Sequence, residues 1–251
     1  MEPLVIVKRT PPLAIVELNR KNKRNALNMA LRDALEDALG ALENDGAVKA
    51  VVLTGGDAFF CAGYDLQEMI DTDLRSLMHR GHEYTRITYF FKKPLVTAVA
   101  GFALAGGFDL ALSGDVIVAA AGAKLGRPEI GWGVNPLMSK LRLRIGFSNA
   151  LRMTLQGATW EAEEARRMGL VDFVVPQTEL LAAAVRQAEL LAKYPLPALI
   201  TTKRAAYAVA TMSPEDAIAY ELGVTAELMA EGTLKKNLQD YAAKIGISKS
   251  S

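Results

Sequence analysis

Residues 95–120 read LVTAVAGFALAGGFDLALSGDVIVAA, and their only charged side chains are two aspartates. Two apolar runs of strand length, residues 95–100 and 116–119, flank a segment at 103–112 that suits a short helix opened by a double glycine. A strand, a helix and a strand at this spacing predict parallel strands joined by crossovers, as in an α/β fold. The aspartates and glycines break the stretch into short pieces, which argues against a membrane-spanning helix.

Further elements precede this stretch. Residues 12–18 and 50–54 are strand candidates, and the second is an apolar run typical of a buried parallel strand. We expect an amphipathic helix between them, with Asn28 as its N-cap. Its apolar face consists of leucines at spacings of four and three, Leu31, Leu35, Leu39 and Leu42.

The second half of the chain changes in character. We expect Thr159 to cap a helix that runs to Met168 and ends at Gly169, followed by a strand at 171–175.

After residue 195 the pattern predicts helices only, over 197–210 and 214–245. The sequence therefore predicts two parts, an α/β core at 1–195 and a helical C-terminal segment at 196–251.

Composition excludes several classes of protein. With 29 Lys+Arg against 28 Asp+Glu, the net charge of +1 offers no basic excess for nucleic acid or an anionic membrane. The single Cys excludes an internal disulfide and a cysteine-rich metal site, and two His do not favour a histidine metal cage. The first residues lack the pattern of a signal peptide, so we expect a cytoplasmic protein.

Two carboxylates in apolar surroundings are the candidate chemical groups. Asp109 lies in the stretch above, and Glu129 follows it by twenty residues. Paired carboxylates in a low-dielectric pocket take different pKa values, which suits one to donate and the other to accept a proton. Turns at 59–66 and 104–109 contain small residues whose amides could form an oxyanion hole. Together they indicate acid–base chemistry on a carbonyl compound that passes through an enolate.

Other polar residues leave alternatives open. His79 and His82 lie three apart on an expected helix at 71–91, where a surface position is favoured over a catalytic one. Cys61 has no cation or His beside it in sequence, which favours a small buried thiol. Four cations precede the first helix and suit either solvent or a polyphosphate: Arg20, Lys21, Lys23 and Arg24.

Nearly the whole chain carries a set of motifs in one order and spacing. They are LNR (18–20), NALN (25–28), VVLTGG (51–56), FCAGYDL (60–66), KPLVTAVAG (93–101), GGFDLA (106–111), GRPEIG (126–131), ARRMGLV (165–171) and VVP (174–176). In these motifs the chain resembles the enoyl-CoA hydratase/isomerase (crotonase) superfamily. The resemblance implies a crotonase-like spiral of ββα units, capped by a C-terminal helical segment that mediates homotrimers, two of which often stack into a hexamer.

The resemblance also implies a site. The substrate would be an acyl-CoA thioester of the kind handled in fatty acid metabolism, with CoA entering as part of the substrate and no metal or redox cofactor. Asp109 and Glu129 match the two acid/base positions, and the N–H groups of Tyr64 and Gly106 match the oxyanion hole. The positions that match CoA or substrate contacts are Arg24, Ala26, Leu27, Ala62, Asp65, Leu66, Gly107, Trp132, Leu137, Tyr241 and Lys244.

Two departures from the family pattern bear on the reaction. Typical hydratases carry Glu where this chain has Asp109, and the shorter side chain can misplace the attacking water. Leu137 stands where some relatives place a third carboxylate, which argues against dienoyl isomerase and dehalogenase patterns, and Trp132 with Leu137 would form an apolar wall around the acyl chain. The segment Glu-Ile-Gly-Trp-Gly at 129–133 also resembles hydroxycinnamoyl-CoA hydratase-lyases.

Three functions follow as hypotheses. The first is hydration of a 2-enoyl-CoA, with Glu129 as principal acid/base and Asp109 holding the water. The second is a Δ3,Δ2-enoyl-CoA isomerase, which needs only one strong base. The third, of another class, is a non-catalytic subunit that binds CoA thioesters. Fold membership alone does not choose among them.

Overall fold

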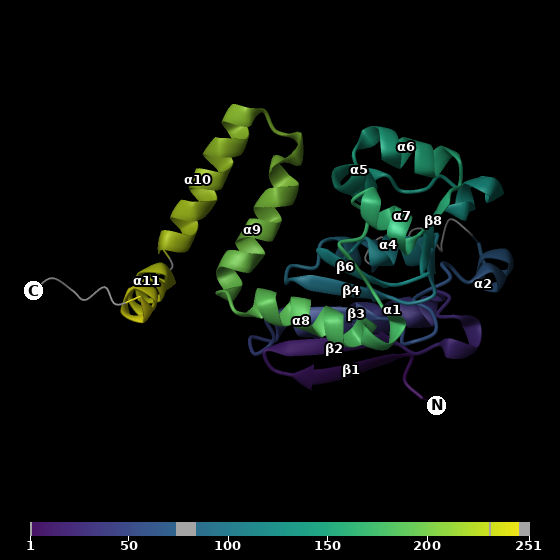
Figure 1. Cartoon of the computed structure of the whole chain (residues 1–251), viewed down its shortest axis with the longest axis horizontal. Helices are drawn as coiled ribbons and strands as arrows, with labels where there is room; N and C mark the ends of the chain where they lie inside the picture. The colour runs from purple at the N-terminus through teal and green to yellow at the C-terminus, as the bar shows by residue number, and fades with distance from the viewer. Residues whose placement is uncertain (1, 74–83, 231, 246–251) are drawn as a thin grey trace, which may run out of the picture. The chain divides into compact units, whose positions relative to one another are not determined.

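The computed structural model of the chain describes residues 2–73, 84–230 and 232–245. The chain forms two compact units, residues 1–193 and 194–251. The first unit contains the β-sheets, and the elements of the second are helices (Figure 1). Among the described helices, none combines the length and apolar character that a membrane span requires.

A six-stranded sheet lies at the centre of the first unit, in the order β1-β2-β3-β4-β6-β9. Its strands are β1 (Val5–Thr10), β2 (Leu13–Leu18), β3 (Ala50–Thr54), β4 (Leu95–Val99), β6 (Val116–Ala120) and β9 (Phe173–Val175). β1 and β2 form an antiparallel hairpin, and the remaining neighbours pair parallel. Because β3 and β4 are buried along their whole length, their sequences are uninterrupted apolar runs.

A second, three-stranded sheet is formed by β5 (Phe102–Leu104), β7 (Lys124–Gly126) and β8 (Thr159–Glu161). β5 pairs parallel with β7, and β7 pairs antiparallel with β8. The helix expected at 103–112 is therefore shorter, α4 (Gly106–Ala111), because the residues before it pair with β7. The two sheets together place the double glycine and Asp109 on the connection from β5 to β6.

Helix α1 (Met29–Asn44) follows the sequence expectation closely. The Asn28 side chain accepts a hydrogen bond from the Leu31 amide at 3.1 Å, so the predicted N-cap is confirmed. The four predicted leucines, Leu31, Leu35, Leu39 and Leu42, are fully buried. Helix α8 (Leu180–Ala192) packs on β3, β4 and β6 and covers the middle of the large sheet (Figure 1).

A buried lysine holds the end of α1 against the sheet. Lys93 precedes β4, and its ammonium donates to the carbonyl oxygens of Leu42, Asp45 and Val48 at 2.7, 2.6 and 2.8 Å. Burial lowers the pKa of Lys93, against the opposing charges of Asp45 and Glu43. The lysine thus binds the last turn of α1 and the loop that follows it through three carbonyl oxygens.

Two expected elements between residues 159 and 175 differ from the structure. Thr159 does not cap a helix: it lies in β8, and α7 (Ala162–Arg167) begins three residues later because Trp160 pairs with Leu125. The strand expected at 171–175 is limited to β9.

The expected helix at 71–91 is not continuous from its start. Helix α2 (Leu66–Asp71) ends where that helix was expected to begin, and Thr72 is extended. Residues 84–89 are helical. His79 and His82 fall outside the residues that the structure describes.

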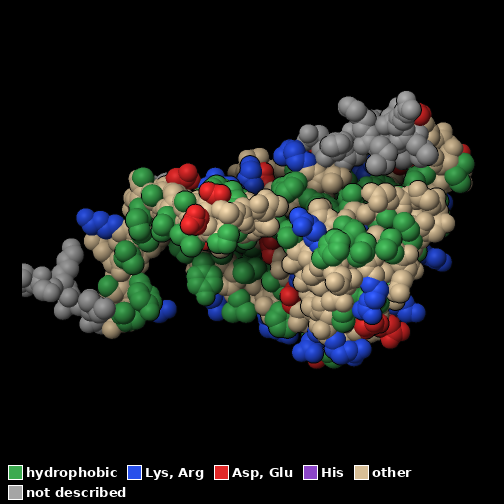
Figure 2. All heavy atoms as spheres, turned by 90° about the horizontal axis from the view of Figure 1, so that it is seen from above, with side chains coloured by type: hydrophobic (Ala, Val, Ile, Leu, Met, Phe, Trp, Pro, Cys, Tyr) green, Lys and Arg blue, Asp and Glu red, His purple; other side chains and the backbone are tan. Residues whose placement is uncertain are grey.

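The remaining helices of the first unit are α5 (Ser139–Ile145), α6 (Phe147–Leu155), η1 (Lys21–Lys23), η2 (Pro128–Trp132) and η3 (Gln177–Glu179). The second unit contains α9 (Leu196–Ala208), η4 (Val209–Thr211), α10 (Pro214–Ala230) and α11 (Thr233–Lys244). The single helix expected at 214–245 is divided at Gly232, whose φ of +75° is left-handed. Large apolar side chains are exposed on these helices (Figure 2), including Ile218, Leu222, Met229, Leu238 and Tyr241.

Candidate active site

Two tight turns meet in the first unit, one before α2 and the other before α4. Gly63 has a φ of +102°, and a Cβ added to it would lie 2.8 Å from the Leu104 carbonyl oxygen and 3.4 Å from the Gly106 nitrogen. Ala105 has φ +49° and ψ −123°, a conformation that L-residues rarely adopt and that costs about 1–3 kcal/mol. Such strain is concentrated at functional sites, and here it lies directly before Gly106.

The predicted oxyanion-hole amides belong to these turns. Within the described part of the chain, the N–H groups of Tyr64 and Gly106 have no hydrogen-bond acceptor. Gly106 is the first residue of α4, so the helix itself offers its amide no partner. The Tyr64 ring lies against Gly106, where a Cβ would come within 2.8 Å of the ring. Two free donors are therefore available on adjoining turns.

A buried arginine joins the two candidate carboxylates. Arg127 Nη2 donates to Asp109 Oδ1 at 2.6 Å, and Arg127 Nη1 donates to Glu129 Oε1 at 3.2 Å. The Arg127 side chain is 0% exposed, and its guanidinium lies 4.7 Å from the centroid of the Phe108 ring. The Tyr89 hydroxyl donates to the same Asp109 Oδ1 at 2.8 Å.

The surroundings shift the proton affinities of this cluster. Burial raises the pKa of Asp109, and Arg127 and Tyr89 oppose that shift. Burial likewise raises the pKa of Glu129, against the opposing effects of its own backbone amide and Arg127. The pKa of Tyr89 is also raised, by burial and by the charge of Asp109, so its hydroxyl remains a donor. Burial thus raises the pKa of both carboxyl groups, and perturbed pKa values of this kind cluster at functional sites.

One oxygen of this cluster has no partner. Glu129 Oε2 is buried, and no described residue is within hydrogen-bond reach of it. A buried acceptor without a donor is costly, and such atoms in native structures call for a functional explanation.

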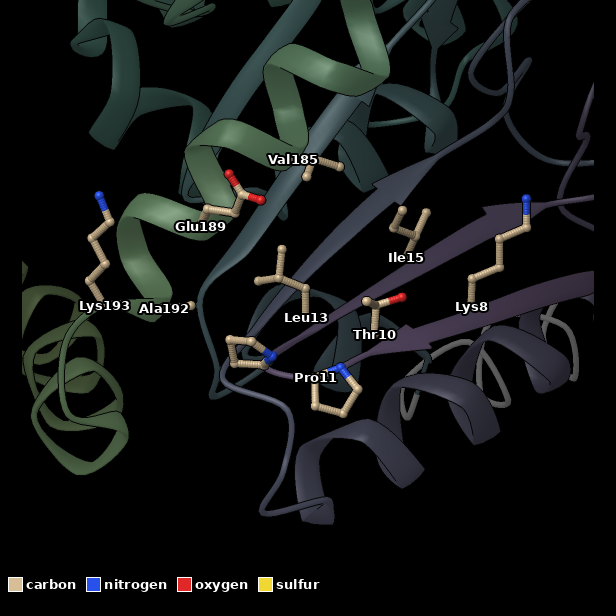
Figure 3. A pocket seen from close by; sticks show the side chains of 10 residues that line it. Lys8, Thr10, Pro11, Leu13, Ile15, Val185, Glu189, Ala192 and Lys193 are labelled. Atoms are coloured by element: carbon tan, nitrogen blue, oxygen red, sulfur yellow. The ribbon is translucent and has the colours of Figure 1, made fainter.

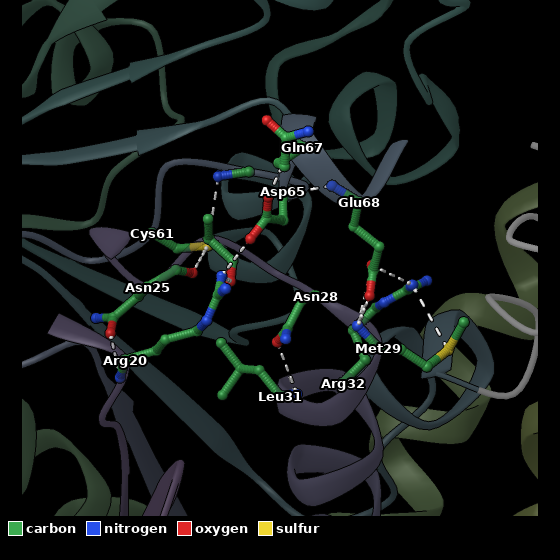
Figure 4. Close-up of polar contacts among 12 residues, drawn as sticks. Arg20, Asn25, Asn28, Met29, Leu31, Arg32, Cys61, Asp65, Gln67 and Glu68 are labelled. Atoms are coloured by element: carbon green, nitrogen blue, oxygen red, sulfur yellow. Dashed lines mark hydrogen bonds and ion pairs between the residues drawn. The ribbon is translucent and has the colours of Figure 1, made fainter. Parts of the chain in front are cut away.

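The segments predicted to hold CoA are brought together (Figure 4). The Ala62 amide donates to the Arg24 carbonyl oxygen at 3.1 Å, and Leu27 and Tyr64 form a parallel β-bridge. Asp65 caps α2 through the amides of residues 67 and 68, at 3.0 and 3.4 Å. Predicted positions 24–27 and 62–66 therefore lie on two segments that are bonded to each other.

Two of the four cations that precede α1 form ion pairs within the protein. Arg20 pairs with Asp65 at 2.6 Å, and Lys21 pairs with Glu17 at 3.3 Å. Burial alone would raise the pKa of Asp65, but Arg20 and the amides of α2 outweigh it and lower that pKa. The side chains of Lys23 and Arg24 are exposed.

Cys61, directly before the segment 62–66, is confirmed as a buried thiol. Its Sγ donates to the Asn25 carbonyl oxygen at 3.0 Å, and burial raises its pKa to about 12. The Asn25 side chain in turn donates to the carbonyl oxygens of Gly55 and Phe60. These buried contacts fix the loop that carries Arg24 and Leu27.

No contact with the carboxylate cluster is described for four further residues that were predicted to bind substrate, Trp132, Leu137, Tyr241 and Lys244. Trp132 and Leu137, the expected apolar wall, are 58% and 41% exposed. Tyr241 and Lys244 lie in α11 of the second unit. Among the residues that the structure describes, no cluster of three or more His, Cys, Asp or Glu could hold a metal ion.

A pocket of about 380 Å³ lies elsewhere, between the β1–β2 turn and the end of α8 (Figure 3). Its lining includes Lys8, Pro11, Leu13 and Glu189, and none of its lining residues is a predicted site residue. It is therefore separate from the carboxylate cluster.

Comparison with known proteins identifies the family of the chain. Residues 9–247 match the family described as enoyl-CoA hydratase/isomerase. The chain belongs to this family. A probable enoyl-CoA hydratase of Rhizobium meliloti is 35% identical over 248 residues, which are 96% of this chain and 95% of that protein. The 2,3-dehydroadipyl-CoA hydratase of Escherichia coli is 38% identical over 206 residues, 80% of each protein.

Solved structures of this family share the fold. The crystal structure of an enoyl-CoA hydratase from Mycobacterium tuberculosis superposes with a TM-score of 0.89 at 32% identity, covering 97% of each chain. An enoyl-CoA hydratase subunit from Geobacillus kaustophilus gives a TM-score of 0.88, also at 32% identity, covering 96% of this chain and 95% of that one. The expected crotonase membership and α/β fold are confirmed.

For this family member, sequence reasoning missed two residues of the cluster. Arg127 lies two positions before Glu129 in a motif that the sequence singles out, and its type and proximity were a usable signal. Tyr89 lies twenty residues before Asp109 and has no local signal, because only the fold brings its hydroxyl to the carboxylate.

Proposed function

We propose that the protein hydrates a 2-enoyl-CoA thioester to the 3-hydroxyacyl-CoA. The observation that carries this proposal is the pair of desolvated carboxylates, Asp109 and Glu129, on the segments beside the free amides of Tyr64 and Gly106. The relatives described above, which are named as hydratases, support the same reaction class. They also argue against a subunit that only binds CoA thioesters.

The mechanism assigns each group one task. The N–H groups of Tyr64 and Gly106 donate to the thioester oxygen and stabilise the enolate as water attacks C3. A single donor of this kind contributes about 2.7–4 kcal/mol to the transition state. Glu129 takes a proton from the water and returns one to C2, so that the product gains H and OH overall. Asp109 holds the water in line.

The proposal also assigns a binding site to the CoA portion of the substrate. The paired segments 24–27 and 62–66 hold the CoA moiety, and the exposed cations Lys23 and Arg24 suit the phosphates. Gly107 and the wall residues Trp132 and Leu137 adjoin the acyl chain. No metal or redox group enters the scheme, since the hydrogen added at C2 and the hydroxyl added at C3 both come from water.

Substitution of Glu129 tests the assignment. We expect Glu129→Gln to lower kcat for crotonyl-CoA hydration by about 100-fold or more, because a positioned general base contributes 10²–10⁴. Glu163→Gln, an exposed carboxylate in the first turn of α7, is the matched control. Near-wild-type hydration by Glu129→Gln would show that the base is another group.

Δ3,Δ2-Enoyl-CoA isomerisation is the second candidate. The observation in its favour is that Asp109 is already bound by Arg127 and Tyr89, which leaves Glu129 as the less restrained base. Incubation with 3-hexenoyl-CoA distinguishes the two reactions. Double-bond migration without a hydroxyacyl product supports the isomerase, and absence of migration removes it.

The assembly is part of the proposal. We assign homotrimer formation to residues 196–251, because large apolar side chains such as Leu222 and Leu238 are exposed there, and exposed apolar patches mark association surfaces. Two trimers could stack into a hexamer, and Tyr241 and Lys244 would then approach the CoA of a neighbouring subunit. A monomer in sedimentation velocity would contradict this assignment. The cytoplasmic location expected from the sequence stays a prediction.

A further inference from the structure

The proposed mechanism assigns no role to Arg127, although this residue contacts both carboxylates. It follows β7, and its amide donates to the Ala158 carbonyl oxygen at 3.1 Å, which fixes its backbone to the segment before β8. The guanidinium is fully buried on the Phe108 ring and reaches a carboxylate on each side. Its Nε has no hydrogen-bond partner among the described residues, so the two carboxylates are what compensate the buried charge.

The arginine treats the two carboxylates unequally. Asp109 Oδ1 receives two donors, Arg127 at 2.6 Å and Tyr89 at 2.8 Å. Glu129 receives from Arg127 one longer contact of 3.2 Å on Oε1, and its Oε2 has no donor among the described residues. Hydrogen bonds to a carboxylate favour its charged form, so Asp109 is the better stabilised anion.

Charge balance points the same way. With Asp109 and Glu129 ionised, the cluster with Arg127 carries one net negative charge, and uptake of a single proton makes it neutral. A neutral product is favoured in a site that excludes water. The proton therefore binds to Glu129, at the oxygen without a donor.

We propose that Arg127 is a positioning residue that separates the roles of the two carboxylates. It stabilises the anion of Asp109 and fixes Oε1 of Glu129, so that Oε2 is the atom that exchanges the proton. This inference rests on the proposed function and deepens it. It also explains how an aspartate can serve where typical hydratases have a glutamate, because the guanidinium holds the shorter side chain in place.

Kinetics of two Arg127 variants test the proposal. Arg127→Gln removes the charge and the clamp. We expect kcat for crotonyl-CoA hydration to fall roughly 100-fold, the effect of a misplaced catalytic group. We also expect the acid limb of kcat/KM to move up by about 1–3 pH units, since an opposite charge at this range lowers a carboxyl pKa by that amount. Arg127→Lys keeps the charge but not the two-point fork, so kcat falls while the acid limb stays near its wild-type position.

The control is Arg144→Gln. Arg144 also pairs with a carboxylate, that of Asp172, and donates to the Leu170 carbonyl oxygen, but it lies outside the cluster. The titratable and charged groups around the carboxylates are unchanged in this control: Arg127, Tyr64, Tyr84 and Tyr89, with Lys140 over the Tyr89 ring. An Arg127→Gln variant with the kcat and acid limb of the control would overturn the proposal, as would wild-type kcat in Arg127→Lys.

A second readout does not depend on turnover. Carboxyl ¹³C chemical shifts, titrated by NMR in wild type and both variants, report the proton affinity of Glu129 directly. We expect the Glu129 midpoint to rise in Arg127→Gln and to stay close to wild type in Arg127→Lys. An unchanged midpoint in Arg127→Gln overturns the proposal whatever the reaction is. Absence of hydration in the wild type, with the NMR shift present, would instead contradict the proposed function alone.

Discussion

Substitution of Gly106 by alanine tests the oxyanion hole through a contact that the structure defines. A Cβ at Gly106 would lie 2.8 and 2.9 Å from two carbons of the Tyr64 ring, closer than real Cβ atoms approach. Either the ring or the Gly106 backbone has to move, and both residues supply a candidate donor. Overpacking of this kind costs about 1–3 kcal/mol of folding free energy. Displacement of one donor costs about 2.7–4 kcal/mol in the transition state, which lowers kcat by 10²–10³.

The assay follows the loss of the conjugated enoyl absorbance of crotonyl-CoA. We expect Gly106→Ala to lower kcat by about 100-fold or more, with a smaller change in KM. Gly46→Ala is the matched control, because a Cβ there meets nothing within 4 Å. Adding Tyr64→Ala to Gly106→Ala removes the contact while keeping both amides, so kcat should recover by about tenfold or more, the size of coupling between touching residues. A double variant no faster than Gly106→Ala alone would refute the reasoning.

Two further predictions concern stability and pH. Lys93→Met removes the donor of three carbonyl oxygens, so the free energy of unfolding in urea should fall by about 3 kcal/mol or more with kcat unchanged, and an unchanged midpoint would contradict the role of Lys93. Because burial raises the pKa of Glu129, the acid limb of kcat/KM for the wild type should lie above the ordinary glutamate value of 4.5, since activity requires the ionised base and is lost as pH falls through the raised pKa. An acid limb at or below 4.5 would show that a different group limits the rate.

Local patterns in the sequence predict the elements that local interactions determine. The α1 helix follows from four leucines on one face and from Asn28 three residues before the Leu31 amide that it caps. The buried strands β3 and β4 follow from uninterrupted apolar runs. Both signals lie within a few residues of the element that they specify.

Strand pairing between residues far apart in sequence explains why two predicted elements differ from the structure. Thr159 has the residue type of an N-cap, but pairing of Trp160 with Leu125 draws it into β8. The predicted helix at 103–112 loses its first residues to β5 for the same reason, because Ala103 pairs with Leu125 and Leu104 pairs with Gly126. In each case a partner more than twenty residues away overrides the local preference.

In the candidate site, too, local sequence patterns predict some residues and the folded structure alone reveals others. Residue types and motif spacing identify Asp109, Glu129 and the two turns, since the motifs are contiguous in sequence. The bridge through Arg127 and the hydroxyl of Tyr89 depends on side-chain directions in the folded chain, which one sequence does not reveal. The unequal binding of the two carboxylates is therefore a finding of the structure.

Mass spectrometry of the products tests the central claim most directly. Wild type and Glu129→Gln would each be incubated with crotonyl-CoA and with 3-hexenoyl-CoA. The account predicts that wild type adds the mass of one water to crotonyl-CoA and that Glu129→Gln does so at a rate lower by about 100-fold or more. A wild-type protein that moves the double bond of 3-hexenoyl-CoA but adds no water to either substrate would contradict it.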